Sequence, residues 1–386
     1  MFSRRLPDHA DTNALTRALD ELRAEGTPFV DLTESNPTRA DLPYDPQILN
    51  VLADPRGLRY EPHPLGLASA RAAVAAEQAR RGMHVDAGQV VLTASTSEAY
   101  TWLFKLLCNP GECVLVPRPS YPLFEHLTRL EGIRAEPYEL EYHGRWAIDV
   151  ESVRAAPADT RAILVVSPNN PTGSYISVEE CALLDGLCQE RNWALVADEV
   201  FAEYPLEAVR PLTGLAARTT ALSFTLSGLS KFAALPQLKL GWMIVGGRPD
   251  LRAEALAALE LIADSFLSVS TPVQVALTSL LIASAPVRTA IQQRTLNNLK
   301  RLREKAAGFP ACEVLRTEGG WSVVIRVPAT RAEEQLVLDL LKKERILVHP
   351  GYFFDFPREA FIIVSLLPPE QLFSGAIDRV LRFASC

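Results

Sequence analysis

The chain has 386 residues, of which 48% are hydrophobic and 22% are charged. Such a composition is typical of a globular α/β protein, and the length suffices for two domains with their own cores. The net charge of −7 and the lack of a Lys/Arg-rich stripe argue against nucleic-acid binding. No apolar run has the length of a membrane span or a signal peptide, so we expect a cytoplasmic protein without membrane contact.

The cysteines and histidines do not predict a metal site. The chain has six residues of each type, and neither set shows the spacing of metal ligands. A chain of this size needs no disulfide framework, so we expect mostly buried thiols. The cysteines are Cys108, Cys113, Cys181, Cys188, Cys312 and Cys386.

The N-terminal quarter alternates helical and turn-rich segments. Residues 14–25 have helical periodicity, and residues 28–46 are rich in proline and turn formers. A second proline-punctuated loop at 58–67 precedes a helix at 68–82. We interpret this part as an arm followed by ordered loops that can carry function.

Short strands alternate with helices through the central part. A strand at 89–93 is followed by a capping box from Ser95 to Glu98 and a helix at 98–107. This alternation predicts a mostly parallel sheet covered by helices on both faces, with ligands beyond the carboxyl ends of its strands. The other predicted elements are strands at 113–116, 162–167, 194–197, 222–226 and 243–245 and a helix at 178–191.

The C-terminal part has a different composition of elements. Two long helical patterns at 272–283 and 287–307 are suited to connect two domains. Beyond them, strands within 321–327 and 361–367 mix with helices at 331–343 and 369–383, which indicates a smaller α+β domain. We therefore expect an arm and part of the small domain at 1–44, a large ligand-binding domain at 45–285 and a small domain at 286–386.

One lysine lies in an unusual setting. Lys231 belongs to the stretch SGLSKFAALPQLKLGW, residues 227–242, where small and apolar residues surround it. An apolar setting favours the free amine, which is the nucleophile that a carbonyl or a pyridoxal aldehyde requires. Taken alone, the stretch is also typical of a solvated loop lysine. The polar residues of other loops are needed to choose between the two interpretations.

Several of those loops follow predicted strands and carry polar residues. They contain Ser95-Thr96-Ser97, Tyr121 between two prolines, the NPTG sequence 170–173, and Asp198-Glu199. With the Lys231 stretch, their order and spacing resemble the class I/II aminotransferases, which are pyridoxal-phosphate enzymes of fold type I, from DLTESNPT at 31–38 to the C-terminus. The resemblance implies the large and small domains of a PLP-dependent transferase, pyridoxal 5′-phosphate as cofactor, and amino-group transfer between a small amino acid and a 2-oxo acid.

The resemblance also implies roles at the cofactor ring. Lys231 would hold the cofactor as an internal aldimine and then move a proton as general base and acid. Asp198 would favour the protonated ring nitrogen, Asn170 would donate to the 3′-oxygen, and Tyr121 would stack on the ring. A helix cap, an ordinary turn and simple packing are the alternatives for these three residues.

At the phosphate, the resemblance implies a helix N-terminus and a cation. The hydroxyl and backbone N–H groups of residues 95–97 would bind the phosphate, although a simple helix cap explains the same residues. Ser227 and Lys239 would assist, and Tyr60 would reach the phosphate of the neighbouring subunit, which implies a homodimer with shared active sites.

Four positions depart from the family pattern. Phe201 and Gly228 stand where a ring-binding Tyr and a phosphate-binding Ser are usual, and Lys239 replaces an arginine. Ile363 replaces the arginine that binds the substrate carboxylate, so substrate recognition must use other groups.

The candidates for that work are Asn36, Arg39 and Trp321. Because Ile363 cannot bind a carboxylate, a PLP-dependent lyase, acting by β-elimination or a related reaction, is the alternative enzyme. A non-catalytic PLP-binding protein is the alternative outside enzymes.

Overall fold

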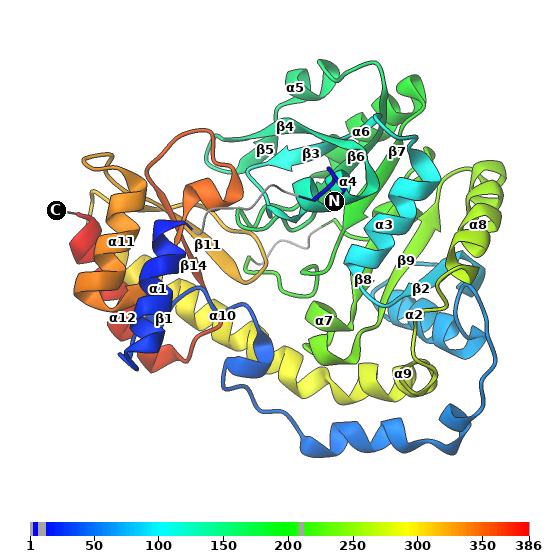
Figure 1. Cartoon of the computed structure of the whole chain (residues 1–386), viewed down its shortest axis with the longest axis horizontal. Coiled ribbons are helices and arrows are strands. Elements are labelled where there is room, and N and C mark those ends of the chain that lie inside the picture. Colours follow the sequence, from blue (N-terminus) through cyan, green and yellow to red (C-terminus); the bar gives the residue numbers. More distant parts are fainter. Residues whose placement is uncertain (1–2, 7–12, 208–211, 386) are drawn as a thin grey trace.

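A computed structural model describes residues 3–6, 13–207 and 212–385 (Figure 1). Its largest unit is an eight-stranded sheet with the order β2-β9-β8-β7-β6-β3-β4-β5. The central pairs are parallel, whereas β9 runs antiparallel to β2 and β8, and β5 antiparallel to β4. The mostly parallel sheet is thus confirmed. The strands are β2 (Val90–Thr93), β3 (Cys113–Arg118), β4 (Arg134–Tyr142), β5 (Trp146–Ile148), β6 (Thr160–Val166), β7 (Ala194–Asp198), β8 (Ser223–Gly228) and β9 (Gly241–Gly246).

Helices cover both faces of this sheet, and the strand residues alternate between the two cores. Leu164 and Val196 pack in one core, whereas their neighbours Val165 and Leu195 pack in the other. Because both faces are covered, the strands other than β4 and β5 are buried almost throughout instead of alternating between buried and exposed residues. On this large unit lie α2 (Ala68–Arg80), α3 (Thr96–Leu107), α4 (Leu123–Glu131), α5 (Val150–Arg154), α6 (Val178–Arg191), α7 (Leu229–Phe232) and α8 (Pro249–Asp264).

The smaller domain has a four-stranded antiparallel sheet with the order β10-β11-β14-β13. The N-terminal arm packs on it: Leu15 and Leu22 share a core with Leu340 and Ile377, and β1 (Val30–Asp31) pairs with β12 (Ile346–Leu347). Figure 1 shows α1 beside α11. The remaining elements are α1 (Ala14–Ala24), β10 (Glu313–Val314), β11 (Ser322–Arg326), α11 (Glu333–Glu344), β13 (His349–Pro350), β14 (Phe361–Ser365) and α12 (Glu370–Ala384).

Two consecutive helices, α9 (Thr271–Ala283) and α10 (Ala285–Ala306), run from the large sheet to the small domain (Figure 1). Among the described residues, no single helix has both the length and the apolar composition to cross a membrane, and these two meet that test only as a pair bent by 52°. Short 3-10 helices complete the chain: η1 (Pro37–Arg39), η2 (Pro46–Ala53), η3 (Pro55–Leu58), η4 (Ala87–Gln89), η5 (Leu215–Ala217), η6 (Pro236–Leu238) and η7 (Gly351–Phe354).

The structure differs from the sequence predictions in elements that they omit and in one helix cap. The predictions omit, among others, α4, α5, α8 and the last two strands of the large sheet, β4 and the edge strand β5. β4 has the sequence RAEPYELEY, whose charges and proline hide a partly exposed strand. Ser95 does cap α3 by accepting the Glu98 N–H at 3.2 Å. The Glu98 carboxylate, however, accepts from the N–H of Ala94 and the hydroxyl of Ser268, so the predicted reciprocal capping box is not formed.

Candidate active site

The predicted site residues converge where neighbouring strands end. In the parallel register Val166 of β6 lies opposite Asp198 of β7, and Asp198 lies opposite Leu226 of β8. The strand β8 then leads directly into α7, which carries Lys231. The carboxyl ends of adjacent parallel strands share one edge of the sheet, so Asp198 and Lys231 face a common region.

The Lys231 amine lies between the two domains in an aromatic setting. Its Nζ donates to the carbonyl of Ser35 at 3.3 Å and lies 5.2 Å from the ring centroid of Trp321 and 5.7 Å from that of Phe201. Burial lowers the pKa of Lys231, and the carboxylate of Glu34 opposes this effect. A lowered pKa increases the fraction of free amine, as a Schiff-base lysine needs.

Two tyrosine hydroxyls hold the backbone of the lysine segment. Tyr204 donates to the carbonyl of Lys231, and Tyr44 donates to the carbonyl of Ala234, both at 2.7 Å. Ala234 has a left-handed backbone with φ +55°, so these contacts hold a turn that favours glycine. The sequence predictions include neither tyrosine. The general rule that a buried tyrosine hydroxyl needs a hydrogen-bond partner could have suggested them, but it does not name the partner.

Asp198 is buried and receives two hydrogen bonds. Its Oδ1 accepts the N–H of Val200 at 3.1 Å, and its Oδ2 accepts the hydroxyl of Tyr100 at 3.0 Å. Burial raises the pKa of Asp198 to about 6, while both hydrogen bonds act in the opposite direction. The helix-cap alternative does not describe this carboxylate, because one of its two donors comes from the distant helix α3. Tyr100 is a site residue that the sequence predictions omit.

The first turn of α3 and the start of β9 lie close together. A Cβ on Gly241 would come within 3.2 Å of the backbone of both Ser95 and Ser227. The first-turn N–H groups of Thr96 and Ser97 have no intrahelical acceptor because of their position. The buried Ser227 hydroxyl also has no partner among the described residues. Unpaired donors at a helix N-terminus favour an anion.

Lys239 lies near this turn, two residues before Gly241, and is exposed with a left-handed backbone of φ +51°. Its ammonium is therefore free to approach an anion from the solvent side.

The loop after β6 presents Asn170, which is partly exposed, above a buried Asn169. Asn169 accepts from the hydroxyl of Ser120 at 2.8 Å and donates to the carbonyl of Pro119 at 3.0 Å. The NPTG loop and the loop before Tyr121 are thereby joined. Gly173, at φ +70°, has no room for a Cβ, which would lie 2.3 Å from a methyl of Thr317. This sequence is therefore more than an ordinary turn.

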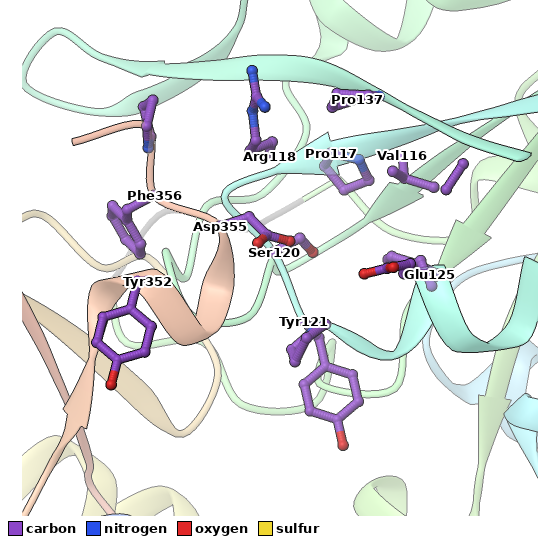
Figure 2. A pocket seen from close by; sticks show the side chains of 14 residues that line it. Val116, Pro117, Arg118, Ser120, Tyr121, Glu125, Pro137, Tyr352, Asp355 and Phe356 are labelled. Carbon is purple, nitrogen blue, oxygen red and sulfur yellow. The ribbon is translucent and has the colours of Figure 1, made fainter. Parts of the chain in front are cut away.

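Tyr121 is 48% exposed and borders a cavity of about 400 Å³ at the junction of the two domains. Figure 2 shows Tyr121 on the large-domain side of this cavity and Tyr352 and Phe356 on the small-domain side. Its lining residues include neither Lys231 nor Asp198. The exposed ring is available to a ligand, and the structure does not bury it in simple packing.

The predicted substrate residues are less closely gathered. Asn36 caps η1, since its Oδ1 accepts the N–H and the hydroxyl of Thr38, and Arg39 at the end of the same short helix is exposed. Trp321 is buried against Phe201 and Tyr204 and lies next to Lys231. The structure thus places Trp321 next to Lys231, whereas the side chain of Asn36 binds Thr38 in its own short helix.

Two further positions lie away from these residues. Ile363 of β14 is 1% exposed and packs with Phe354 and Phe356 in a hydrophobic core. Tyr60 is 72% exposed in the loop before α2, where it lines a small cavity with Leu267. Within one subunit, Tyr60 therefore lies apart from the groups around Lys231.

The residues present fit pyridoxal 5′-phosphate. A buried carboxylate suits its ring nitrogen, a lysine with a lowered pKa suits its aldehyde, and the unpaired donors at α3 together with the orphaned Ser227 hydroxyl suit its phosphate. Among the described residues, no group of three or more His, Cys, Asp or Glu could hold a metal ion.

Comparisons with known proteins agree with this geometry. The chain is 26% identical over 373 residues to the glutamate-pyruvate aminotransferase AlaA of Haemophilus influenzae, covering 94% of this chain and 92% of that protein. It is 25% identical over 392 residues to the mouse tyrosine aminotransferase, covering 96% and 85%. In fold it is similar to an aminotransferase from Escherichia coli, with a TM-score of 0.88, 24% identity and coverage of 100% and 98%.

The alanine aminotransferase of Pyrococcus furiosus has the same fold, with a TM-score of 0.87, 23% identity and coverage of 100% and 99%. The family model for aminotransferase class I and II matches residues 28–375. The chain therefore belongs to the class I and II aminotransferases, whose cofactor is pyridoxal 5′-phosphate.

Proposed function

We propose that this aminotransferase moves an amino group between a small amino acid and a 2-oxo acid, with Lys231 as its catalytic residue. The observation that carries the proposal is the Lys231 amine, whose pKa is lowered by burial, at the same sheet edge as the buried Asp198. Relatives named glutamate-pyruvate aminotransferase make glutamate and pyruvate the first substrate pair to test.

When bound, the cofactor supplies an electron sink for the bond that breaks at the substrate α-carbon. Lys231 would hold the cofactor and give way to the substrate amine. It would then take the proton from the substrate α-carbon and deliver it to C4′ of the cofactor, the carbon to which the nitrogen is bonded. Asp198 stabilises the protonated ring nitrogen, Asn170 donates to the ring oxygen, and Tyr121 covers the ring. Trp321 and Phe201 beside Lys231 exclude water from the reacting amine.

At the phosphate end, Thr96, Ser97 and the hydroxyl groups of Ser95 and Ser227 act as donors, and Lys239 provides the positive charge. A lysine offers a point charge without the two parallel hydrogen bonds of an arginine. Lys239 therefore gives weaker directional control of the phosphate, and the helix N-terminus carries more of the binding.

On the substrate side, Arg39 takes over carboxylate binding from the arginine that Ile363 replaces, with Asn36 and Trp321 lining the same side. Arg39 is exposed and follows, in the chain, Ser35, whose carbonyl accepts a hydrogen bond from the Lys231 amine. This nearness in the chain supports the proposed role of Arg39 in binding the substrate carboxylate.

A homodimer with shared active sites is part of the proposal. The segment that packs near α9 carries two exposed apolar side chains. Leu58 is 90% exposed and Tyr60 is 72% exposed. Exposed apolar side chains of this kind mark an association surface. We also propose the division into residues 1–44, 45–285 and 286–386. The cytoplasmic location stays a prediction from composition.

The direct experiment measures alanine formation from glutamate and pyruvate by the PLP-loaded protein and by Lys231→Ala. We expect transfer by the wild type and at least a ~10³-fold loss in the variant. Omission of pyruvate is the control: product that forms at an unchanged rate without an acceptor would indicate a lyase instead. Full turnover by Lys231→Ala would contradict the assigned role.

Subunit mixing tests the shared site. Lys231→Ala and Tyr60→Ala proteins are each expected to have reduced activity, and unfolding and refolding them together creates hybrid dimers. If Tyr60 serves the neighbouring subunit, each hybrid contains one site with both residues intact, so activity rises above that of either parent. No rise in a mixture whose hybrids are verified by mass spectrometry would place Tyr60 with its own subunit's site or outside both.

A further inference from the structure

Tyr100 connects the core of α3 to the buried acid of the candidate active site. Its side chain is 2% exposed, and its ring packs edge-on against Phe124 with a centroid distance of 5.4 Å. From this apolar setting its hydroxyl donates to Oδ2 of Asp198 at 3.0 Å, across a separation of 98 residues in the chain. Burial of a hydroxyl without a hydrogen bond costs free energy, and the hydrogen bond to Asp198 offsets this cost.

The second donor restricts the carboxylate. An ionised carboxylate only accepts hydrogen bonds, and it has lone pairs for about four donors. The N–H of Val200 binds Oδ1, which leaves the plane of the carboxylate free to turn about that single contact. Tyr100 binds Oδ2 from another element, so the two donors together fix the plane and leave lone pairs for a ligand. Both donors also favour the charged carboxylate.

We propose that Tyr100 is a positioning residue that holds the Asp198 carboxylate charged and oriented toward the ring nitrogen of the cofactor. This inference rests on the proposed role of Asp198. Tyr100 itself touches neither cofactor nor substrate in this assignment, and it acts through the carboxylate.

The position of Tyr100 on α3 gives the contact a second consequence. Thr96 begins the helix, and Tyr100 follows it by one turn, so the two side chains lie on the same face. The first turn offers its donors to the phosphate, whereas Tyr100 holds the acid assigned to the ring nitrogen. One rigid helix thereby fixes both ends of the cofactor site relative to each other.

Tyr100→Phe tests the proposal, and Tyr138→Phe is its matched control. Tyr138 is also buried, at 1% exposure, and its hydroxyl donates to the carbonyl of Leu164 at 2.9 Å. Each change removes one buried, hydrogen-bonded hydroxyl, but only the first removes a donor from Asp198. Melting curves of both proteins without cofactor report the structural cost, which we expect to be similar for the two variants.

The informative measurements concern the cofactor. We expect Tyr100→Phe alone to raise the dissociation constant of PLP about tenfold and to lower kcat by about ten- to a hundredfold, since a hydrogen bond to a charged group is lost. The pH at which the visible absorbance of the bound cofactor changes should also move upward. A cofactor ring that is less protonated withdraws less electron density from the C=N nitrogen that joins the cofactor to Lys231. The pKa of that nitrogen therefore rises.

A double-mutant cycle separates this inference from the proposed function. In an Asp198→Asn background, Tyr100→Phe should have no further effect on PLP affinity or on the absorbance profile, because its target is gone. Equal effects of Tyr100→Phe and Tyr138→Phe on PLP affinity and absorbance would overturn the inference. If Asp198→Asn itself leaves both quantities unchanged, the proposed role of Asp198 fails, and the inference fails with it.

Discussion

The two sides of the candidate site are built differently. On the cofactor side, Asp198 and Lys231 belong to a strand end and an adjoining helix of the large sheet, and hydrogen bonds from Tyr100 and Tyr204 hold them. On the substrate side, Asn36 and Arg39 belong to a 3-10 helix of three residues, and Arg39 is exposed. A rigid scaffold thus carries the chemistry that the family shares, whereas a short surface segment carries the proposed recognition of the substrate.

This contrast predicts that mutations on the two sides change different quantities. Changes at the cofactor side should reduce PLP affinity and kcat. Changes at the substrate side should mainly raise KM, because they remove binding that the ground state and the transition state share.

Apart from Lys231→Ala, the largest effect should come from Asp198→Asn, which keeps the shape of the side chain and removes its charge. We expect kcat to fall by about 10²–10³-fold, because the loss of one partner of a buried charged pair typically costs several kcal/mol. Steady-state kinetics with saturating PLP measure this effect, and Asp198→Glu serves as the charge-preserving control. A kcat within twofold of wild type would remove Asp198 from the cofactor side.

Ile363→Arg should have the next largest effect, and it tests the substrate side. Ile363 is buried among Phe354, Phe356 and other apolar residues, so an unpaired guanidinium there should lower the free energy of unfolding by about 3–5 kcal/mol. Ile363→Leu should cost less than about 1.5 kcal/mol. Chemical denaturation gives both values. A stable Ile363→Arg protein with a lower KM for glutamate would instead show that this position opens onto the substrate pocket.

Without cofactor, Asp198→Asn should raise the free energy of unfolding at neutral pH, whereas Ile363→Arg should lower it. Burial raises the pKa of Asp198 from 3.8 to about 6, so between these values the folded protein retains a proton that the unfolded chain loses. This contribution to stability is therefore lost as pH rises through that window. At pH 7 the cofactor-free variant should be more stable than wild type by on the order of 3 kcal/mol, and near pH 4 the two should nearly converge. Denaturation at both pH values tests this difference, and a variant that is less stable at pH 7 would contradict it.

The smallest effect should come from Arg39→Ala. The guanidinium is exposed, so its contact with a substrate carboxylate is partly screened, and we expect KM for the amino acid to rise about tenfold with little change in kcat. Arg59→Ala removes an exposed arginine from the next loop and is the control. Unchanged KM values for both substrates in Arg39→Ala would leave carboxylate recognition to other groups.

The sequence made the cofactor side predictable because its residues follow local patterns. Asp198 and Lys231 come directly after short apolar strands, and the NPTG loop contains its own turn residues, so neighbours in the chain determine each local conformation. The alternation of strands and helices likewise predicts the mostly parallel sheet, which the structure confirms. The charged strand β4, which lies next to the edge strand β5, escaped prediction because its pattern is not apolar.

Contacts between distant segments could not be predicted in this way. The hydroxyl of Tyr100 reaches Asp198 across 98 residues, and that of Tyr44 reaches Ala234 across 190 residues. Neither tyrosine stands in one of the motifs: Tyr100 is placed by the packing of α3, and Tyr44 by the course of the loop between η1 and η2.

The sequence by itself therefore determined the family, the cofactor and the strand ends at which the reactive groups lie. Only the tertiary structure decided that Tyr100 holds the acid, that Ile363 packs in a core, and that Asn36 caps its own short helix. The physical reason is the distance along the chain over which each kind of interaction acts. Backbone conformation and turn chemistry depend on adjacent residues, whereas burial, hydrogen-bond partners and the resulting pKa shifts depend on residues that only folding brings together.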